Sequence, residues 1–428
     1  MHDPRMLREE RDAVRAGVVK KLGTVPPQLD RFYELDTERL TLLKEADALK
    51  HERNQSSEEI ARLKKAGQDA AALITAMKAV SDRIQLHDRR LRAIEEELEE
   101  VAAWIPNLPH ASVPEGRDAA ANVEVAHWGE GRKFDFEPKP HWELAEQLGL
   151  IDFERGPKLA GSGFPLFVGD GARLVRALVD FMLDLHIDRH GYTEVHPAIA
   201  INSKSLRGTG QLPKLAEDMY RIQDEDLWLN PTAEVPVTNI YQDEILEPGV
   251  IPRTLTAYCP SFRKEAGAYG KDTRGIQRLH QFDKVELVRF VLPEKSYEEH
   301  ETLRGHVEAV LRALELPYRV LLLCAGDLSF AASKCYDFET WAPGQKAWLE
   351  VSSCSNFEAF QARRAGIRFR REAGAKPEFA HTLNASGLAL PRIVITILEA
   401  GQDADGRVRI PAAIRDRMGG REWLEPAR

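Results

Sequence analysis

Residues 259–286 read CPSFRKEAGAYGKDTRGIQRLHQFDKVE and form the densest polar stretch of the chain. The pattern predicts a strand, a glycine-rich loop and a second strand. Because side chains alternate between the two faces of a strand, Arg263 and Glu265 are expected on one side, and Phe282 and Glu286 also share a side. One face of the predicted hairpin therefore carries a guanidinium, carboxylates and an aromatic plane.

These side chains suit a site that forms an adenylate. An arginine neutralises the phosphate charge that grows during displacement, an aromatic ring stacks on adenine, and a carboxylate holds an ammonium group. On residue types alone, a salt-bridged hairpin without chemistry is an equally good explanation. The chain has no G-x-x-x-x-G-K-[ST] loop and no G-x-G-x-x-G after a strand, which disfavours a Walker-type or Rossmann nucleotide site.

The surroundings of this stretch predict a sheet of mainly antiparallel strands. Short apolar or alternating runs at 226–230, 281–291, 318–323 and 346–352 read as strands, and residues 173–190 read as an amphipathic helix. The connections are too irregular for a βαβ repeat, so the fold class is α+β, with helices flanking the sheet.

Heptad periodicity marks the N-terminal quarter of the chain. Residues that are apolar except for His87 recur at steps of four and three from Leu73 to Val101. A second seam runs from Leu35 to Leu63, although Arg53 and Ser56 interrupt its middle. A short turn at 64–68 separates the two seams, and its Gly67 can end the first helix in the left-handed conformation. The sequence therefore predicts an antiparallel coiled-coil hairpin, an arm of about thirty residues and ~45 Å.

Composition excludes several classes. The 428 residues are 43% hydrophobic and 30% charged, enough for two or three globular domains, and no apolar run approaches the roughly 18 residues of a membrane span. We expect a cytoplasmic protein without membrane contact. The four cysteines lack C-x-x-C spacing and are expected to be buried free thiols rather than zinc ligands. A net charge of −9 argues against indiscriminate coating of nucleic acid but leaves local basic patches open.

The wording of residues 262–286, F-R-K-E-A-G-x-x-G-x-D-T-R-G-x-x-R-x-H-Q-F-x-K-V-E, resembles motif 2 of bacterial-type seryl-tRNA synthetases, which are class II ligases. The resemblance extends along essentially the whole chain. Residues 230–234 (NPTAE) resemble the family's serine-binding T-x-E loop, 383–392 resemble motif 3, and 173–197 resemble motif 1. Residues 350–356 and 360–364 resemble its metal and ATP segment.

The resemblance implies a domain plan. It places an N-terminal tRNA-binding domain at 1–104, with its helical arm at about 28–101, an entry segment at 105–140, and a class II catalytic domain at 141–428. Motifs 1, 2 and 3 are expected at about 173–197, 259–291 and 383–400. Motif 1 makes the dimer interface in this class, so the resemblance also implies a homodimer.

The implied function is that of a serine–tRNA ligase. Such an enzyme activates L-serine with ATP, uses Mg²⁺, and transfers the seryl group to the 3′ end of tRNA(Ser) and of tRNA(Sec). Two alternatives stay open: an aminoacyl ligase for another acceptor, which is expected to lack the long arm, and a non-catalytic RNA-binding paralogue. The second is disfavoured because the residues of the implied catalytic site are present.

The resemblance assigns roles to individual residues. For ATP these are Arg263 at the α-phosphate, Glu265 at the adenine or ribose, Arg278 at the γ-phosphate, and Phe282 and Arg392 on the two faces of the adenine. For serine they are Thr232, Glu234, Arg263, Glu286, Asn384 and Ser386. Glu350 and Ser353 are the implied Mg²⁺ ligands, and Arg263, Glu350 and Arg392 the implied catalytic group.

Basic residues on the arm are usually a solvated face, but the resemblance implies that they contact tRNA. The candidates are Arg62, Lys64, Lys65, Arg83, Arg89 and Arg90. The chain also departs from the family's pattern at three positions. Ala385 and Pro391 stand where the family often has glycine, and Gly163 stands where a basic residue is common.

Overall fold

The computed structural model describes residues 1–265 and 274–426. Part of the predicted motif 2 loop, 266–273, lies outside the described residues. The chain divides into two compact units, one of residues 2–15 and 24–106 and the other of residue 1, 16–23 and 107–428. No helix of the described residues is long and apolar enough to cross a membrane.

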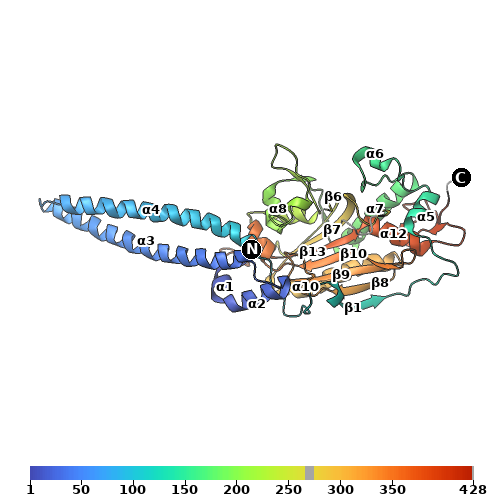
Figure 1. Ribbon diagram of the computed structural model, residues 1–428, viewed down its shortest axis with the longest axis horizontal. Helices are drawn as coiled ribbons and strands as arrows, with labels where there is room; N and C mark the ends of the chain where they lie inside the picture. The colour runs from blue at the N-terminus through green and yellow to red at the C-terminus, as the bar shows by residue number, and fades with distance from the viewer. Residues whose placement is uncertain (266–273, 427–428) are drawn as a thin grey trace. The chain divides into compact units, whose positions relative to one another are not determined.

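The first unit is dominated by two long antiparallel helices, α3 (Pro27–Lys65) and α4 (Ala71–Ala102), which lie side by side in Figure 1. Gly67 adopts a φ of 69° and ends the first helix, as predicted. Leu49, Val80 and Ile84 form a buried cluster between the helices. The predicted hairpin is confirmed. Its 39-residue first helix is longer than the predicted arm, roughly 58 Å at 1.5 Å per residue.

The second unit is built on an eight-stranded sheet in the order β1-β8-β9-β10-β13-β7-β6-β2. All neighbours are antiparallel except β2 and β6. The strands are β1 (Val123–Trp128), β2 (Thr193–Glu194), β6 (Arg253–Phe262), β7 (Gln281–Val291), β8 (Tyr318–Leu322), β9 (Lys334–Ala342), β10 (Ala347–Asn356) and β13 (His381–Ala389). The predicted α+β class with a mainly antiparallel sheet is confirmed.

Three amphipathic helices cover the sheet and bury its core (Figure 1): α7 (Asp170–His190), α10 (Ser296–Ala313) and α12 (Leu390–Gly401). Helix α7 ends at Gly191 with a φ of 71°, because a left-handed residue satisfies its last carbonyl groups. Leu178, Val307 and Ile395, one from each helix, are fully buried in one cluster with strand side chains. This cluster holds the central strands in place.

Short elements complete the two units. They are α1 (Pro4–Glu9), α2 (Arg11–Leu22), α5 (His141–Gln147), α6 (Gly156–Ala160), α8 (Ser203–Thr209), α9 (Glu234–Thr238), α11 (Phe360–Ala365), β3 (Ala200–Ile201), β4 (Trp228–Leu229), β5 (Ile245–Leu246), β11 (Arg368–Phe369), β12 (Glu378–Phe379), β14 (Val408–Arg409) and β15 (Trp423–Leu424). The run at 226–230, predicted as a strand, contributes only β4, which pairs with β3 outside the large sheet.

The four cysteines, Cys259, Cys324, Cys335 and Cys354, are buried free thiols, as predicted. Burial raises the pKa of the Cys335 and Cys354 thiols well above their usual value. They therefore stay protonated and behave as small apolar side chains.

Candidate active site

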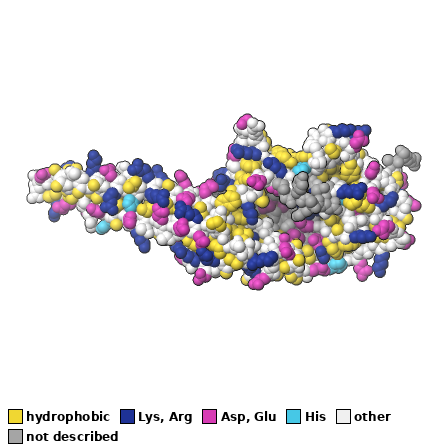
Figure 2. Space-filling model, viewed as in Figure 1, with side chains coloured by type: hydrophobic (Ala, Val, Ile, Leu, Met, Phe, Trp, Pro, Cys, Tyr) yellow, Lys and Arg dark blue, Asp and Glu magenta, His cyan; other side chains and the backbone are white. Residues whose placement is uncertain are grey.

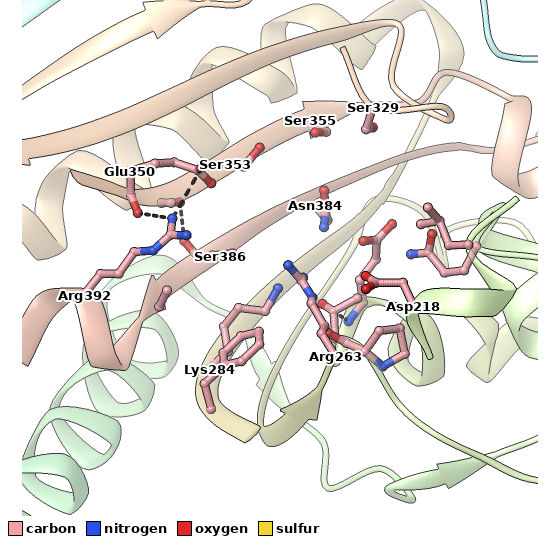
Figure 3. Close-up of a pocket in the computed structure, with 18 of the residues that line it drawn as sticks. Asp218, Arg263, Lys284, Ser329, Glu350, Ser353, Ser355, Asn384, Ser386 and Arg392 are labelled. Atoms are coloured by element: carbon pink, nitrogen blue, oxygen red, sulfur yellow. Dashed lines mark hydrogen bonds and ion pairs between the residues drawn. The ribbon is translucent and has the colours of Figure 1, made fainter. Parts of the chain in front are cut away.

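A cavity of about 520 Å³ opens over the middle of the sheet. Its walls come from the segment after β6, the start of β7, the loop before α9, strands β10 and β13, and the start of α12 (Figure 3). It brings together nearly all residues implied for serine and ATP: Thr232, Glu234, Arg263, Glu265, Arg278, Phe282, Glu350, Ser353, Asn384, Ser386 and Arg392. Thr232 and Arg392, which are 160 positions apart in the chain, thus share one pocket.

Of the residues that the resemblance implies for serine and ATP, Glu286 alone lies below the surface of the cavity. It is 1% exposed and is not among the residues that line the cavity. Asn384 Nδ2 donates to its Oε1 at 2.9 Å and Thr232 Oγ1 donates to its Oε2 at 3.2 Å. Lys284 Nζ lies 2.5 Å from the same Oε2. The Glu286 carboxylate therefore connects three segments of the chain from below the cavity.

Lys284 lines the cavity, but the sequence interpretation missed it. Two residues before Glu286 on β7, it shares a face with that carboxylate. The same alternation that grouped Phe282 with Glu286 could have found it. A lysine that is 6% exposed needs a countercharge, and Glu286 supplies one.

Glu234 is the second carboxyl group at this end of the cavity. It is the first residue of α9, 8% exposed, and its Oε1 accepts a hydrogen bond from Gln361 Nε2 at 2.7 Å. Burial and the negative charge of Glu286 raise the pKa of Glu234 to about 7. Two neighbouring carboxyl groups thus sit in different environments, one paired with a lysine and one with a neutral amide.

Arg263 stands across the cavity from β10 and the start of α12 (Figure 3). Its Nε donates to the Pro231 carbonyl oxygen at 3.2 Å, and its guanidinium carbon lies 5.2 Å from the centre of the Phe282 ring. The backbone of the loop before α9 and an aromatic face therefore hold the arginine in one orientation. A planar group that enters the cavity meets Phe282 beside a fixed positive charge.

Strand alternation does not explain how Arg263 and Glu265 reach the cavity, so that part of the prediction is wrong. Strand β6 ends at Phe262, and Glu265 has a left-handed φ of 51°. Both residues line the cavity all the same. Arg278 Nη1 donates to Glu265 Oε2 at 3.0 Å, so an ion pair joins the two flanks of the loop.

Gly163, one of the three departures, packs against His280 and leaves no room for a side chain. Its φ is 80°, and a Cβ atom there would lie 2.4 Å from the Cδ2 atom of His280. His280 in turn donates its backbone N–H to the Gly163 carbonyl oxygen, and its Nδ1 lies 3.0 Å from the Arg263 carbonyl oxygen. Phe164 stacks on the same ring at 5.4 Å. The missing side chain makes room for a histidine that supports the backbone of Arg263.

Ala385 and Pro391, the other two departures from the family's sequence pattern, fit the fold without strain. Ala385 is fully buried on β13, where it pairs with Leu287 and Cys354 of the neighbouring strands. Pro391 lies in the first turn of α12, where its missing N–H would have had no helical partner. Asn384, Ser386 and Arg392 keep their places in the cavity wall.

Glu350 and Ser353 point to the same region of the cavity because β10 contains an irregularity (Figure 3). Three residues apart on a regular strand, they would face opposite sides. Glu350 pairs with Glu339 but Ser352 pairs with the adjacent Phe338, so Val351 is an extra residue and the alternation changes phase there. A bulge therefore brings these two oxygen-bearing side chains to the same side of β10.

The surroundings of these two residues suit a hard cation. Asp337 stands opposite Ser353 in the strand register, and burial together with the charge of Glu350 raises the pKa of Asp337 well above its usual range. Arg392 Nη1 lies 3.4 Å from Glu350 Oε2. Magnesium in proteins is usually held by one or two carboxylates together with substrate phosphates, and these oxygen donors fit that pattern. Within 1–265 and 274–426, no group of three or more His, Cys, Asp or Glu side chains could hold a metal by itself.

The basic residues implied for tRNA lie on the other unit, along the hairpin. Arg62, Lys64, Lys65, Arg83, Arg89 and Arg90 are all exposed. Arg90 Nε lies 2.7 Å from Glu38 Oε1 across the two helices, and Arg62 pairs with Glu59 one turn away. Figure 2 shows basic and acidic side chains interspersed over this hairpin. None of these six residues lines the cavity of the second unit.

Models of two protein families match the two parts of the chain. Residues 1–109 match the seryl-tRNA synthetase N-terminal domain, and residues 219–401 match the tRNA synthetase class II core domain (G, H, P, S and T). The matched ranges contain the helical hairpin and nearly all of the cavity wall.

Full-length relatives agree with these matches. The chain is 54% identical over 424 residues to the serine–tRNA ligase of Thermomicrobium roseum, covering 99% of this chain and 95% of the relative. It is 53% identical to the serine–tRNA ligase of Listeria monocytogenes over 99% of both chains. The crystal structure of seryl-tRNA synthetase from Pyrococcus horikoshii complexed with ATP superposes with a TM-score of 0.96, at 36% identity and full coverage of both chains.

Proposed function

The chain belongs to the seryl-tRNA synthetase family and is a serine–tRNA ligase of class II, and from this premise we propose which residues of the cavity carry each part of the reaction. The observation that carries the proposal is the three-donor cluster around Glu286 beside the fixed Arg263 and Phe282. The full-length relatives from Thermomicrobium roseum and Listeria monocytogenes are serine–tRNA ligases, which favours neither a ligase for another acceptor nor a non-catalytic RNA-binding protein.

Serine binds at the end of the cavity lined by Thr232 and Asn384, and its ammonium group reaches Glu286, which lies beneath them, when the side chains above that carboxylate move aside. A carboxylate has about four acceptor positions, and the three donors around Glu286 leave one for the serine ammonium group. Glu234 and Ser386 line the same region. The serine carboxylate then turns toward Arg263, because a guanidinium pairs well with a carboxylate.

ATP binds in the remaining part of the cavity. Phe282 and Arg392 take the two faces of the adenine, Glu265 contacts the adenine or its ribose, and Arg263 holds the α-phosphate. Arg278 serves the γ-phosphate, which requires the Arg278–Glu265 ion pair to open or share its donors. The ATP complex of the Pyrococcus horikoshii relative supports a nucleotide site in this fold.

Glu350 and Ser353 would hold Mg²⁺ against the phosphates. The ion, when bound, supplies positive charge to the phosphate oxygens. Arg392 donates from Nη1 to the Glu350 carbonyl oxygen at 2.6 Å and so fixes the backbone of the bulge beside those oxygens. This hydrogen bond would keep the proposed Mg²⁺ ligands in place before ATP binds.

The first step is an in-line attack of the serine carboxylate on the α-phosphorus, with loss of pyrophosphate. Arg263 neutralises charge on the five-coordinate phosphorus, so catalysis rests on positioning and electrostatics rather than on a covalent enzyme intermediate. In the second step, a hydroxyl of the terminal tRNA ribose attacks the carbonyl carbon of the seryl-adenylate, and AMP leaves.

We assign tRNA binding to residues 1–104, with the hairpin at about 28–101 as the arm, 105–140 as the entry segment and 141–428 as the catalytic domain. Arg62, Lys64, Lys65, Arg83, Arg89 and Arg90 would contact the phosphates of tRNA(Ser) and tRNA(Sec). A homodimer through the motif 1 segment at 173–197 and a cytoplasmic location complete the proposal. The full-length relatives, which are serine–tRNA ligases from bacteria, support it.

The assignment of serine to Glu286 is tested by Glu286→Ala and Glu286→Gln in serine-dependent pyrophosphate exchange. We expect losses of roughly 1,000-fold, because removal of one partner of a buried ion pair leaves Lys284 uncompensated and the ammonium group without its acceptor. Binding of a non-hydrolysable ATP analogue and the thermal unfolding midpoint show whether the variants fold. Near-normal exchange by either folded variant would refute the assignment.

A further inference from the structure

A buried histidine and a buried glutamate lie next to the segment that leads into β7. His141 is the first residue of α5, Glu399 lies near the end of α12, and both side chains are fully buried. His141 Nδ1 lies 3.0 Å from Glu399 Oε1, and the backbone N–H of Ile276 donates to His141 Nε2 at 3.1 Å. Ile276 lines the cavity, whereas His141 and Glu399 do not. The histidine therefore connects α12 with the cavity wall.

The hydrogen bond from Ile276 determines which nitrogen of His141 carries the proton. A backbone N–H can only donate, so Nε2 must accept and the neutral ring carries its proton on Nδ1. Nδ1 then donates to Glu399 Oε1. This assignment follows from the hydrogen-bond partners of the ring. A proton on Nε2 would set two buried N–H groups against each other and leave both without an acceptor.

Donors from other segments hold Glu399 in place. Its Oε1 also accepts from the backbone N–H of His141 at 2.9 Å and from Gln345 Nε2 at 3.1 Å. Its Oε2 accepts from the backbone N–H groups of Gly344 and Gln345 at 2.9 and 3.1 Å. Because both oxygens face donors, the carboxylate cannot turn away without leaving buried N–H groups unsatisfied. Glu399 therefore presents a fixed acceptor to Nδ1 of His141.

Arg278 lies between two anchored points of the chain. It precedes β7, so its backbone lies outside the sheet. Two residues before it, His141 holds the backbone N–H of Ile276. Two residues after it, the backbone N–H of His280 donates to the Gly163 carbonyl oxygen. The path of the backbone at Arg278 therefore depends on both anchors, and a shift at either one moves its guanidinium within the cavity.

Helix α5 also packs closely against this segment. A Cβ atom at Gly275 would lie 2.0 Å from His141 Nε2, closer than packed atoms approach each other. The imidazole ring therefore lies directly on the backbone of the segment. The guanidinium carbon of Arg274 lies 4.7 Å from the centre of a Trp142 ring, next to His141 in the chain. Contacts at three successive residues, 274 to 276, thus accompany the hydrogen bond.

We propose that His141, with its proton fixed on Nδ1 by Glu399, is a positioning residue for ATP that holds the backbone of Ile276 so that Arg278 reaches the γ-phosphate. The inference rests on the proposed role of Arg278. Helix α12 then serves ATP at both ends, because Arg392 in its first turn lines the cavity and Glu399 near its last turn orients the histidine. His141 acts through geometry, since a displaced guanidinium loses its contact with the phosphate.

The proposal predicts a loss of function that depends on the γ-phosphate. His141→Asn keeps an amide that can donate to Glu399, but its side chain is too short to accept from Ile276. The KM for ATP in pyrophosphate exchange should rise about tenfold, the scale of one lost buried hydrogen bond. AMP has no γ-phosphate, so its inhibition constant should stay within about twofold of the parent. Equal losses for ATP and AMP would indicate general damage to the pocket and would overturn the positioning role.

His141→Gln is the matched variant. Its longer side chain brings the amide oxygen to the position of Nε2, where it can accept from Ile276. Both variants lose the packing of the ring and should lower the thermal unfolding midpoint to a similar extent. Only His141→Gln should keep the KM for ATP within about threefold of the parent. If both variants raise the KM equally, the ring acts by filling space and not by accepting from Ile276, and the proposal fails.

Gly275→Ala tests the same contact from the other side and leaves His141 intact. The added Cβ atom must separate His141 Nε2 from the segment, so the KM for ATP should again rise about tenfold without a change for AMP. In the His141→Asn background the shorter side chain leaves room, and Gly275→Ala should add no more than about twofold. An unchanged KM in the single variant, or full additivity in the double variant, would contradict a contact that acts through His141.

Arg278→Ala separates this inference from the function on which it rests. If Arg278 serves the γ-phosphate, this variant raises the KM for ATP and spares the inhibition constant of AMP, and adding His141→Asn raises the KM no further than about twofold. If Arg278→Ala leaves the KM for ATP unchanged, the proposed role of Arg278 is wrong. If Arg278→Ala weakens ATP selectively and His141→Asn either has no effect alone or adds its full effect, Arg278 is assigned correctly and only the positioning role of His141 is wrong.

Discussion

An ion pair across the α3–α4 hairpin is exposed to water, whereas the ion pair below the cavity is buried. The side chains of Arg90 and Glu38 are 49% and 39% exposed, while those of Lys284 and Glu286 are 8% and 0% exposed. An exposed pair gains little from its attraction, because water solvates each partner alone almost as well. A buried pair depends on both partners, and removing one costs about 3–5 kcal/mol.

The difference separates what each region can do. Hairpin cations can leave their partners and bind a phosphate at little cost, which suits the reversible tRNA contact proposed for this unit. The groups around Glu286 keep one geometry because each change leaves a buried group unsatisfied, which suits recognition of a small amino acid. The same residue types thus serve exchangeable contacts in one unit and fixed contacts in the other.

The largest effect expected for a change in the hairpin comes from removing it without touching the pocket. Replacing residues 42–88 by a four-residue Gly–Ser turn joins the helices just beyond the Glu38–Arg90 pair and keeps the buried Leu29, Leu35 and Ile94. Aminoacylation of tRNA should fall roughly 100-fold or more, because two or more charge-assisted contacts of about 1.5 kcal/mol each are lost.

The control for this truncation is serine-dependent pyrophosphate exchange by the same protein. The exchange rate should stay within about twofold of the parent, since no cavity residue lies between positions 42 and 88. Equal loss of both activities would show that the hairpin supports the pocket and that the two regions do not act separately.

How far the sequence predicts the structure differs between the same two regions. The hairpin follows from heptad periodicity, a local property that also places the turn at Gly67. Its two long helices therefore agree with the prediction. The grouping of Arg263, Phe282 and Arg392 was found through the family resemblance, because residues this far apart in the chain share no local pattern.

Two features of the pocket escaped prediction for physical reasons. The bulge at Val351 changes which face Glu350 and Ser353 occupy, and a bulge is specified by pairing with β9 rather than by β10 alone. The Gln361 amide connects Glu234 with Thr382, and neither neighbour is close to it in the chain. Alternation could have found Lys284, but no local rule could have found Gln361.

An intermediate effect is expected at Gly163, on the rim of the fixed region. Gly163→Ala would place a Cβ atom 2.4 Å from His280 and force a non-glycine residue into a left-handed backbone, which alone costs about 1–2 kcal/mol. The displaced histidine would release the Arg263 carbonyl oxygen, and the KM for ATP should rise by about tenfold for a loss of ~1.4 kcal/mol in binding.

Gly161 supplies a matched control two residues away. It also has a positive φ, 94°, but a Cβ atom there would meet nothing within 4 Å. Gly161→Ala should therefore lower the thermal midpoint through backbone strain and leave the KM for ATP unchanged. If both variants raise the KM equally, backbone strain in the loop, rather than His280, controls the position of Arg263.

The smallest expected effect is that of Arg90→Ala on stability. The pair with Glu38 is exposed on both sides, so the thermal midpoint should shift by no more than about 1 °C. If Arg90 binds a tRNA phosphate, the KM for tRNA should nevertheless rise several-fold, and the slope of log KM against log salt should decrease by about one.

Glu38→Gln distinguishes a contact with tRNA from a structural ion pair, because it breaks the same pair and keeps the charge of Arg90. A cation that binds phosphate is freed by this change, so the KM for tRNA should stay the same or fall. If Arg90 only holds the two helices together, both Arg90→Ala and Glu38→Gln break its ion pair. The KM for tRNA should then rise equally in both variants. Equal effects would show that Arg90 stabilises the hairpin rather than binding tRNA. An exposed ion pair would then act as a fixed contact.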